Sequence, residues 1–117
     1  MAAKRLLVYP AFYRRVRHYR DRIAIREGRL QVARTFVEAA QDLVALLLKN
    51  PRRGHPARFE SPDLVDILRV AVPAFPVFAL FYRWDGKTLT VITLEHTAQD
   101  LPARLAGLLS TTRKRAS

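Results

Sequence analysis

The sequence contains no cysteine, and this absence excludes several kinds of site at once. Without thiols the chain has no disulfide framework, no thiolate zinc site and no cysteine nucleophile. Long apolar runs are also missing, since runs such as Leu43–Leu48 are far too short to span a bilayer. The apolar stretch that follows Lys4 and Arg5 is interrupted by Pro10 and then by arginines, so we expect no secretory signal.

The common sequence motifs of enzymes are missing as well. There is no GxSxG, no HExxH and no phosphate-binding glycine loop. The three histidines, His18, His55 and His96, lie far apart in sequence and lack the spacing of metal ligands. We therefore expect neither a metal ion nor a cofactor.

Acidic residues are scarce compared with basic ones. Ten Asp and Glu face 21 Lys and Arg, which gives a net charge of +11, and 17 of the basic residues are arginine. Residues 1–34 carry ten basic and two acidic side chains, whereas residues 35–99 are balanced. Such a surface attracts polyanions, namely nucleic acid, an acidic protein or anionic lipid. A GC-rich genome also produces an arginine-rich composition without any function attached.

The first half of the chain has the pattern of two helices. A short β-like run, Arg5–Tyr9, stops at Pro10, which is well tolerated in the first turn of a helix. Apolar residues then recur at helical spacing, and Gly28 suits the end of this helix. A second apolar period runs from Leu30 to Leu47 and ends at Asn50-Pro51. Two amphipathic helices that are joined by only a few residues around Gly28 should pack as an antiparallel hairpin.

The second half has the pattern of strands, and with the first half it predicts the fold class. Pro73-Ala74 and Asp85-Gly86 supply turns between successive strands, which makes an antiparallel meander. The strands are expected at Val65–Val72, Phe75–Trp84 and Thr88–Glu95, a last helix at Ala98–Leu109, and a frayed basic tail at 110–117. The sequence therefore predicts one α+β domain over residues 1–117, in the order β-α-α-β-β-β-α, with the hairpin packed on a small antiparallel sheet.

Three arginines are candidates for an anion site. Arg69 and Arg83 lie on adjacent expected strands, and Arg58 lies in the loop before them. If they converge on one sheet face, they can bind a phosphodiester or stabilise a developing negative charge. The alternative is that they form ordinary ion pairs, Arg83 with Asp85 or Glu95 and Arg69 with Asp66. The sequence alone leaves both possibilities open.

His96 and the arginines of the first helix are the remaining candidates. His96 follows the last strand, where it either fixes the turn into the final helix or acts as a general acid or base. Arg14, Arg15 and Arg17 occupy the polar faces of the first helix. They form either a solvated face or a stripe that binds nucleic acid or an acidic partner.

Several features recur in a fixed order along the chain, from about Leu6 to Leu101. They are a first strand ending at Pro10-Ala11, a hairpin closing in Leu47-Leu48-Lys49-Asn50-Pro51, a Gly54-His55-Pro56 turn, Leu68-Arg69 before a strand, Tyr82-Arg83 at the end of an apolar strand, and His96 followed by Gln99-Asp100. This ordered set resembles the RelE/ParE superfamily of toxins from bacterial type II toxin–antitoxin systems.

The resemblance implies a compact toxin in the cytoplasm that is wrapped by a cognate acidic antitoxin. The chain would then exist as a homodimer or as a toxin–antitoxin hetero-oligomer. The long hairpin and the His-x-x-Gln-Asp ending look more like the ParE branch, whose members inhibit growth by binding DNA gyrase.

The RelE branch, which cleaves mRNA on the ribosome, is the alternative. On that branch's pattern the matching catalytic positions are Arg69, Arg83 and His96. Arginines such as Arg52 and Arg53 stand where RelE-type nucleases commonly carry lysines, and an arginine stays protonated and is a poor general base. A third reading is a basic nucleic-acid-binding domain without toxicity.

Overall fold

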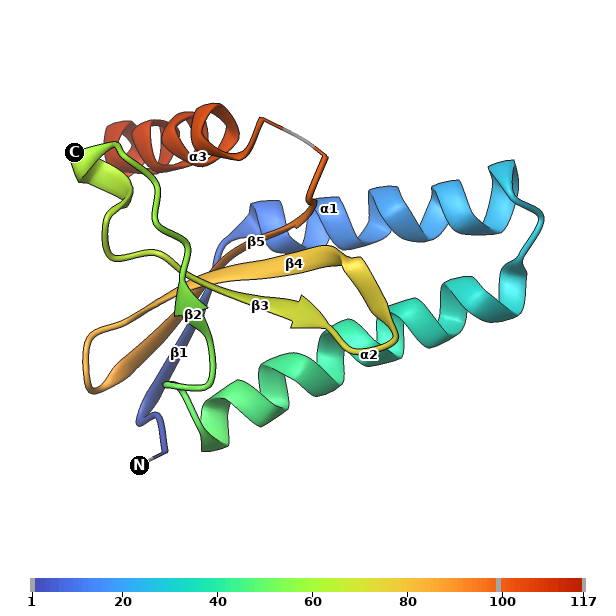
Figure 1. The fold of residues 1–117 in the computed structure, drawn as a ribbon, viewed down its shortest axis with the longest axis horizontal. Coiled ribbons are helices and arrows are strands. Elements are labelled where there is room, and N and C mark those ends of the chain that lie inside the picture. Colours follow the sequence, from blue (N-terminus) through green and yellow to red (C-terminus); the bar gives the residue numbers. More distant parts are fainter. Residues whose placement is uncertain (1, 99, 117) are drawn as a thin grey trace.

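The computed structural model describes residues 2–98 and 100–116, with side chains described through residue 109 (Figure 1). The elements are β1 (Arg5–Val8), α1 (Pro10–Asp21), the π-helix η1 (Arg22–Arg26), α2 (Leu30–Lys49), β2 (His55–Pro56), the 3-10 helix η2 (Pro62–Leu64), β3 (Leu68–Val72), β4 (Phe75–Trp84), β5 (Thr88–His96) and α3 (Leu101–Ala116). The expected α+β class, with a helical hairpin on a mostly antiparallel sheet, is confirmed.

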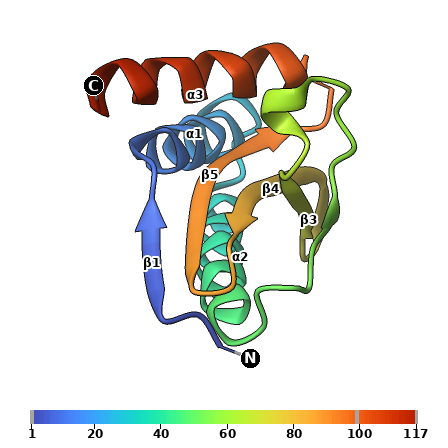
Figure 2. The same ribbon diagram turned by 90° about the vertical axis from the view of Figure 1, so that its left-hand side faces the viewer.

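One sheet holds all five strands in the order β1-β5-β4-β3-β2. β3, β4 and β5 form the expected antiparallel meander. Two pairings were not predicted: β1 joins β5 in parallel, as Figure 2 shows, and the two-residue β2 joins the start of β3. The strand expected from Val65 begins only at Leu68, because the chain before it forms η2 and a turn.

The helical hairpin begins and turns where the sequence predicts. Pro10 stands in the first turn of α1, where its fixed φ is compatible with a helix and its missing N–H costs nothing. α1 then widens into η1, which the sequence did not predict. Gly28 has φ +63, a conformation that favours glycine, and it reverses the chain before α2 begins at Leu30.

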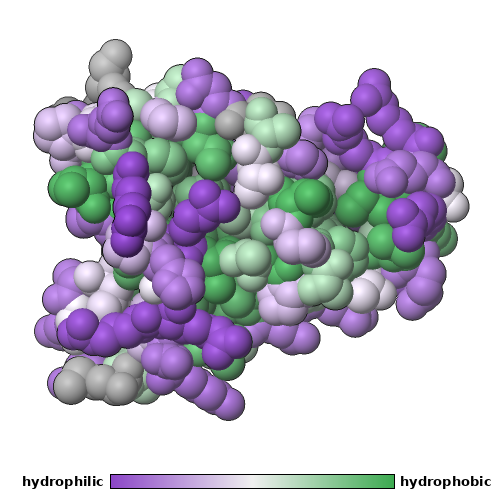
Figure 3. Space-filling view, viewed as in Figure 1, coloured by the Kyte–Doolittle hydropathy of each residue, from purple (hydrophilic) through white to green (hydrophobic). Residues whose placement is uncertain are grey.

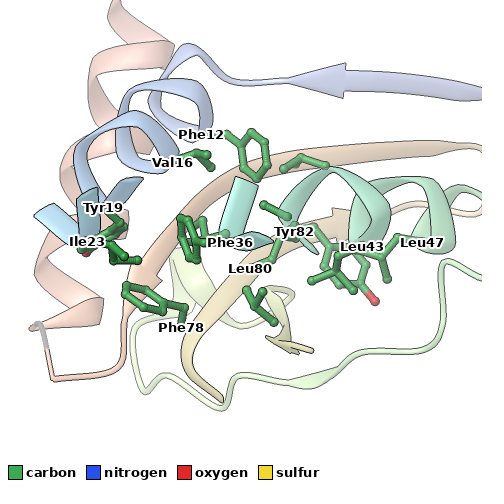
Figure 4. Close-up of a cluster of buried hydrophobic side chains, with 14 of the residues drawn as sticks. Phe12, Val16, Tyr19, Ile23, Phe36, Leu43, Leu47, Phe78, Leu80 and Tyr82 are labelled. Atoms are coloured by element: carbon green, nitrogen blue, oxygen red, sulfur yellow. The ribbon is translucent and has the colours of Figure 1, made fainter. Parts of the chain in front are cut away.

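The larger apolar core lies between the hairpin and one face of the sheet (Figure 4). We call it the hairpin cluster, and its fully or nearly buried members include Phe12, Val16, Tyr19, Ile23, Phe36, Leu43, Leu47, Phe78, Leu80 and Tyr82. From β4 it takes the even-numbered residues, as the alternation of a strand requires. This cluster fixes the hairpin against β4 and β5.

A second core lies on the other face of the sheet, beneath α3. We call it the α3 cluster, and it contains Leu64, Ile67, Ala79, Phe81, Ile92, Leu101, Leu105 and Leu109. α3 begins three residues later than expected, since the backbone N–H of Ala103 donates to the Asp100 carboxylate and Pro102 occupies the first turn. It ends at Ala116, the fraying expected at 110–117 stays a prediction, and residue 117 lies outside the described residues. None of the described helices is long and apolar enough to cross a membrane.

Candidate protein-binding site

A buried carboxylate organises the end of β5. Glu95 is fully buried, and its Oε1 accepts a hydrogen bond from Arg15 Nε at 3.0 Å. Thr93 Oγ1 donates to Oε2 at 2.7 Å, and Tyr19 Oη donates to Oε1 at 3.3 Å. Arg104 Nε lies 2.9 Å from Oε1 as an ion pair, without the angle of a hydrogen bond. Glu95 therefore joins α1, β5 and α3, and Arg15 is held inward, unlike its neighbours on α1.

His96 lies beside this network and fixes the chain after the strand. Its backbone N–H donates to Tyr19 Oη at 3.0 Å, and its Nδ1 accepts a hydrogen bond from the N–H of Ala98 at 3.0 Å. The imidazole meets the Phe78 ring edge-on, with 5.3 Å between the ring centroids. These contacts are those of a residue that shapes the turn toward α3.

The sheet separates His96 from the two candidate strand arginines. His96 is the register partner of Phe78, which belongs to the hairpin cluster. Arg69 is the register partner of Phe81, which belongs to the α3 cluster, and its guanidinium carbon lies 5.8 Å from the centroid of that ring. Arg83 alternates with Phe81 along β4 and so shares the face of Arg69. The structure brings the two arginines to one face and His96 to the other.

Arg83 is already engaged on its face. Its Nε donates to the Asp66 carboxylate at 3.0 Å, and its Nη2 donates to the Asp63 carbonyl at 2.8 Å. Asp66 is thus the acidic partner of Arg83, where the sequence suggested Asp85 or Glu95 for this role. Asp85 instead caps the β4–β5 turn, where N–H groups of Thr88 and Lys87 lower the pKa of its carboxyl.

The other candidate arginines lie at the surface. Arg58 is exposed in the loop between β2 and η2, and its φ of +59 is unusual for a residue with a side chain. Arg14 and Arg17 are exposed on α1, and neither is in an ion pair with a described residue. Among the described side chains, no three of His, Asp and Glu gather as metal ligands would.

A cleft opens where the tip of the hairpin extends past the sheet; we call it the hairpin–sheet cleft. Figure 3 shows hydrophobic surface gathered between α1, α2 and the start of β4, bordered by hydrophilic side chains. The cleft has a volume of about 520 Å³. Its lining residues are Tyr19, Arg22, Ile23, Glu27, Arg29, Val32, Phe75, Val77, Phe78, His96 and Ala98.

The chemistry of the hairpin–sheet cleft suits a protein segment. An exposed apolar patch with a polar rim is typical of a docking surface. Two arginines, Arg22 and Arg29, lie on the rim, and Glu27 is within 3.8 Å of one of them. Sequence reasoning missed this cleft because Phe75 and Val77 lie in a nearly continuous apolar run, which is typical of a buried strand. The structure instead places both of them in the lining of the cleft.

The fold and the cleft together define a class: a small basic α+β domain, with a helical hairpin on one face of a five-stranded sheet and an apolar cleft beside it. The sequence model of one family, the ParE toxin of type II toxin-antitoxin system, parDE, matches residues 6–101. The chain belongs to this family, which confirms the resemblance to RelE/ParE toxins and the preference for the ParE branch.

A solved structure supports the same fold. It is the "Chromosomal ParDE TA system from P. aeruginosa", which is similar to this chain with a TM-score of 0.55 at 16% sequence identity. The similarity covers 79% of this chain and 94% of that chain. Among curated proteins, none matches the sequence.

Proposed function

We propose that the protein is a toxin that inhibits growth in the cytoplasm by binding a protein target such as DNA gyrase, and that a cognate acidic antitoxin neutralises it. The observation that carries this proposal is the hairpin–sheet cleft, which has a volume of about 520 Å³, a mostly apolar lining and arginines on its rim. Membership of the ParE toxin family supports the toxin role.

The distribution of charge favours an acidic partner. Residues 1–34, which form β1, α1, η1 and the start of α2, carry ten basic and two acidic side chains. A partner of opposite charge associates with such a surface faster, and partners of like charge are repelled from it. An antitoxin segment with apolar side chains for the cleft and carboxylates for its rim fits this surface, and it neutralises the toxin by occupying the cleft that binds the target.

Inhibition by binding is favoured over RNA cleavage by the position of the candidate catalytic groups. A general acid or base must lie within reach of the same reacting centre as the groups that stabilise charge. His96 lies on the hairpin face of the sheet, whereas Arg69 and Arg83 lie on the α3 face. Arg83 is also bound to Asp66, which supports a structural role for it.

The test is induced expression of the full chain in bacteria, with growth, plasmid supercoiling and transcript integrity measured together. We expect growth arrest, loss of supercoiling and intact transcripts. Cut transcripts with normal supercoiling would support a RelE-like nuclease instead, and continued growth would support a non-toxic binder. Co-expression of the small acidic protein expected from the neighbouring reading frame should restore growth.

Two exposed valines provide a matched pair of variants for the cleft. Val77 is 49% exposed and lines the cleft, whereas Val65 is 68% exposed and lies outside it. Val77→Asp should relieve the arrest at unchanged protein level, because it places a charge in the apolar surface. Val65→Asp should leave the arrest unchanged. Equal toxicity of the two variants would show that the cleft is not the binding surface.

A further inference from the structure

α3 lies almost wholly beyond the residues that the family model matches. That match ends at Leu101, which is the first residue of α3, so the family model does not cover this helix. Leu101, Leu105 and Leu109 pack in the α3 cluster. Arg104, which stands between them in sequence, instead reaches the end of β5, near which α1 also lies (Figure 2). α3 thus contacts the sheet through a charged side chain as well as through its leucines.

Arg104 and Arg15 approach the same oxygen of Glu95 from two different helices. Arg104 Nε lies 2.9 Å from Glu95 Oε1, and Arg15 Nε lies 3.0 Å from it. The Glu95 side chain is fully buried, whereas that of Arg104 is 36% exposed. A buried carboxylate depends on the groups that compensate its charge, because an uncompensated charge in the interior is costly. When Arg104 is removed, Arg15 should therefore move toward the oxygen that has lost a partner.

Arg15 connects Glu95 to Tyr19. Arg15 Nη2 donates to Tyr19 Oη at 2.7 Å, and that hydroxyl donates to Glu95 Oε1 at 3.3 Å. The same hydroxyl accepts a hydrogen bond from the backbone N–H of His96 at 3.0 Å. The Tyr19 hydroxyl is thus bonded to three groups, and a shift of Glu95 or Arg15 changes its position.

Tyr19 and His96 form part of the wall of the hairpin–sheet cleft. Both line the cleft together with Phe78. The Phe78 ring lies edge-on to each of them, with 4.7 Å between its centroid and that of Tyr19 and 5.3 Å to that of His96. Because closely packed side chains transmit a displacement to their neighbours, a shift of Tyr19 alters the surface that a ligand of the cleft contacts.

We propose that Arg104 is a positioning residue for the hairpin–sheet cleft: through Glu95 it holds Tyr19 and His96 in the arrangement that binds. α3 then sets the affinity of the cleft, although none of the described residues that line the cleft belongs to α3. This inference rests on the proposed function of the cleft as a binding surface. The alternative is that Arg104 only fastens α3 to the sheet, in which case its loss leaves the three aromatic rings unchanged.

The test measures the cleft by NMR on the purified full chain. The probe is anilinonaphthalene sulfonate, whose aromatic rings suit the apolar lining and whose sulfonate suits the arginines on the rim. Its affinity is determined from the shifts of the Tyr19, Phe78 and His96 signals, so that only binding at the cleft is counted. Arg104→Met removes the charge and the donor at a partly exposed position. We expect the Tyr19 and His96 signals of the free protein to shift, and the probe to bind at least about fivefold more weakly.

Two control variants separate the proposal from its alternatives. Arg104→Lys keeps a positive charge on a long side chain and should retain most of the affinity. Arg14→Met removes the same charge from an exposed position of α1 that is in no ion pair with a described residue, and should also retain it.

Three results would overturn the proposal. Unchanged signals or unchanged affinity in Arg104→Met would leave Arg104 as an anchor of α3 alone. A loss of affinity in Arg104→Lys as large as that in Arg104→Met would show that the ion pair with Glu95 is not the cause. An equal loss in Arg14→Met would assign the effect to net charge. Because the probe is bound by purified protein, a failure here is distinct from an absence of growth arrest.

Discussion

Arginines at the end of β5 and arginines at the edge of β3 differ in whether nearby carboxylates neutralise their charge. At the end of β5, Arg15 and Arg104 converge on the buried Glu95, whose oxygens are also bonded by Tyr19 and Thr93. At the edge of β3, basic side chains line a pocket of about 700 Å³ and face no described carboxylate. These basic residues are Arg53, His55 and Arg69. The first arrangement holds elements of the same chain together, whereas the second leaves its charge available to another molecule.

The largest loss of stability should come from removing the Glu95 carboxylate, which organises the end of β5. Glu95→Ala leaves Arg15 and Tyr19 without their partner at a buried site, which should lower the free energy of unfolding by about 3 kcal/mol. Urea denaturation measures this loss, and Glu60→Ala at an exposed loop position is the control. A loss below about 1 kcal/mol would mean that the network is not a structural one.

The second-largest loss of stability should come from the tightly packed loop at Gly54, which lies against β3 and β4. Gly54→Ala puts a methyl group against the Tyr82 hydroxyl and the Arg69 carbonyl, and should cost about 2 kcal/mol of unfolding free energy. Gly107 provides the matched control, because it lies in α3 with open space around it, and Gly107→Ala should stabilise by up to about 1 kcal/mol. If the two variants melt alike, the loop is not held as tightly as the contacts indicate.

A smaller effect should come from Arg69 itself. Its packing over Phe81 contributes at most about 1 kcal/mol at a partly exposed site, so Arg69→Gln should leave stability nearly unchanged. Arg15→Gln should cost more, because it removes the hydrogen bond to buried Glu95. Thermal melts of the two variants compare an arginine used for folding with one that is free to bind. Equal losses would contradict this difference.

The smallest effect should come from His18. Partial burial, followed by the charges of Arg15 and Arg22, lowers the pKa of His18 from 6.5. The folded state therefore binds this proton less readily than the unfolded chain, so stability is fully present above pH 6.5 and declines as the pH falls below it. His18→Gln should remove that part of the pH dependence, measured as the change of unfolding free energy between about pH 7.5 and 5.5. An unchanged slope would assign the dependence to other groups.

Local patterns predicted the elements well. β4 has the bounds that the sequence indicates, since a nearly continuous apolar run lies between the turns at Pro73-Ala74 and Asp85-Gly86. The hairpin was predictable for the same reason, because its apolar period is interrupted once, at Gly28. These signals lie within a few residues of the structure that they specify.

Long-range pairings were not predictable, because nothing local specifies them. Glu95 meets Arg15, 80 positions away, and Tyr19, 76 positions away. The separation of His96 from Arg69 depends on strand registers, including a shift between Phe81 and Tyr82 that spacing alone does not show. The sequence therefore named several residues of interest without showing which of them share a face.

β4 and β5 lie between the hairpin cluster and the α3 cluster and contribute residues to both. We therefore expect the two sides of the sheet to open separately. Among the side chains described for α3, leucines of the α3 cluster and Arg104 contact the rest of the molecule, and we expect the helix to detach as a unit while the hairpin stays packed. Amide protons in the middle of β4, by contrast, become accessible to deuterium only when the whole domain unfolds. The molecule should thus open in a fixed hierarchy, with the last helix first and the central strands last.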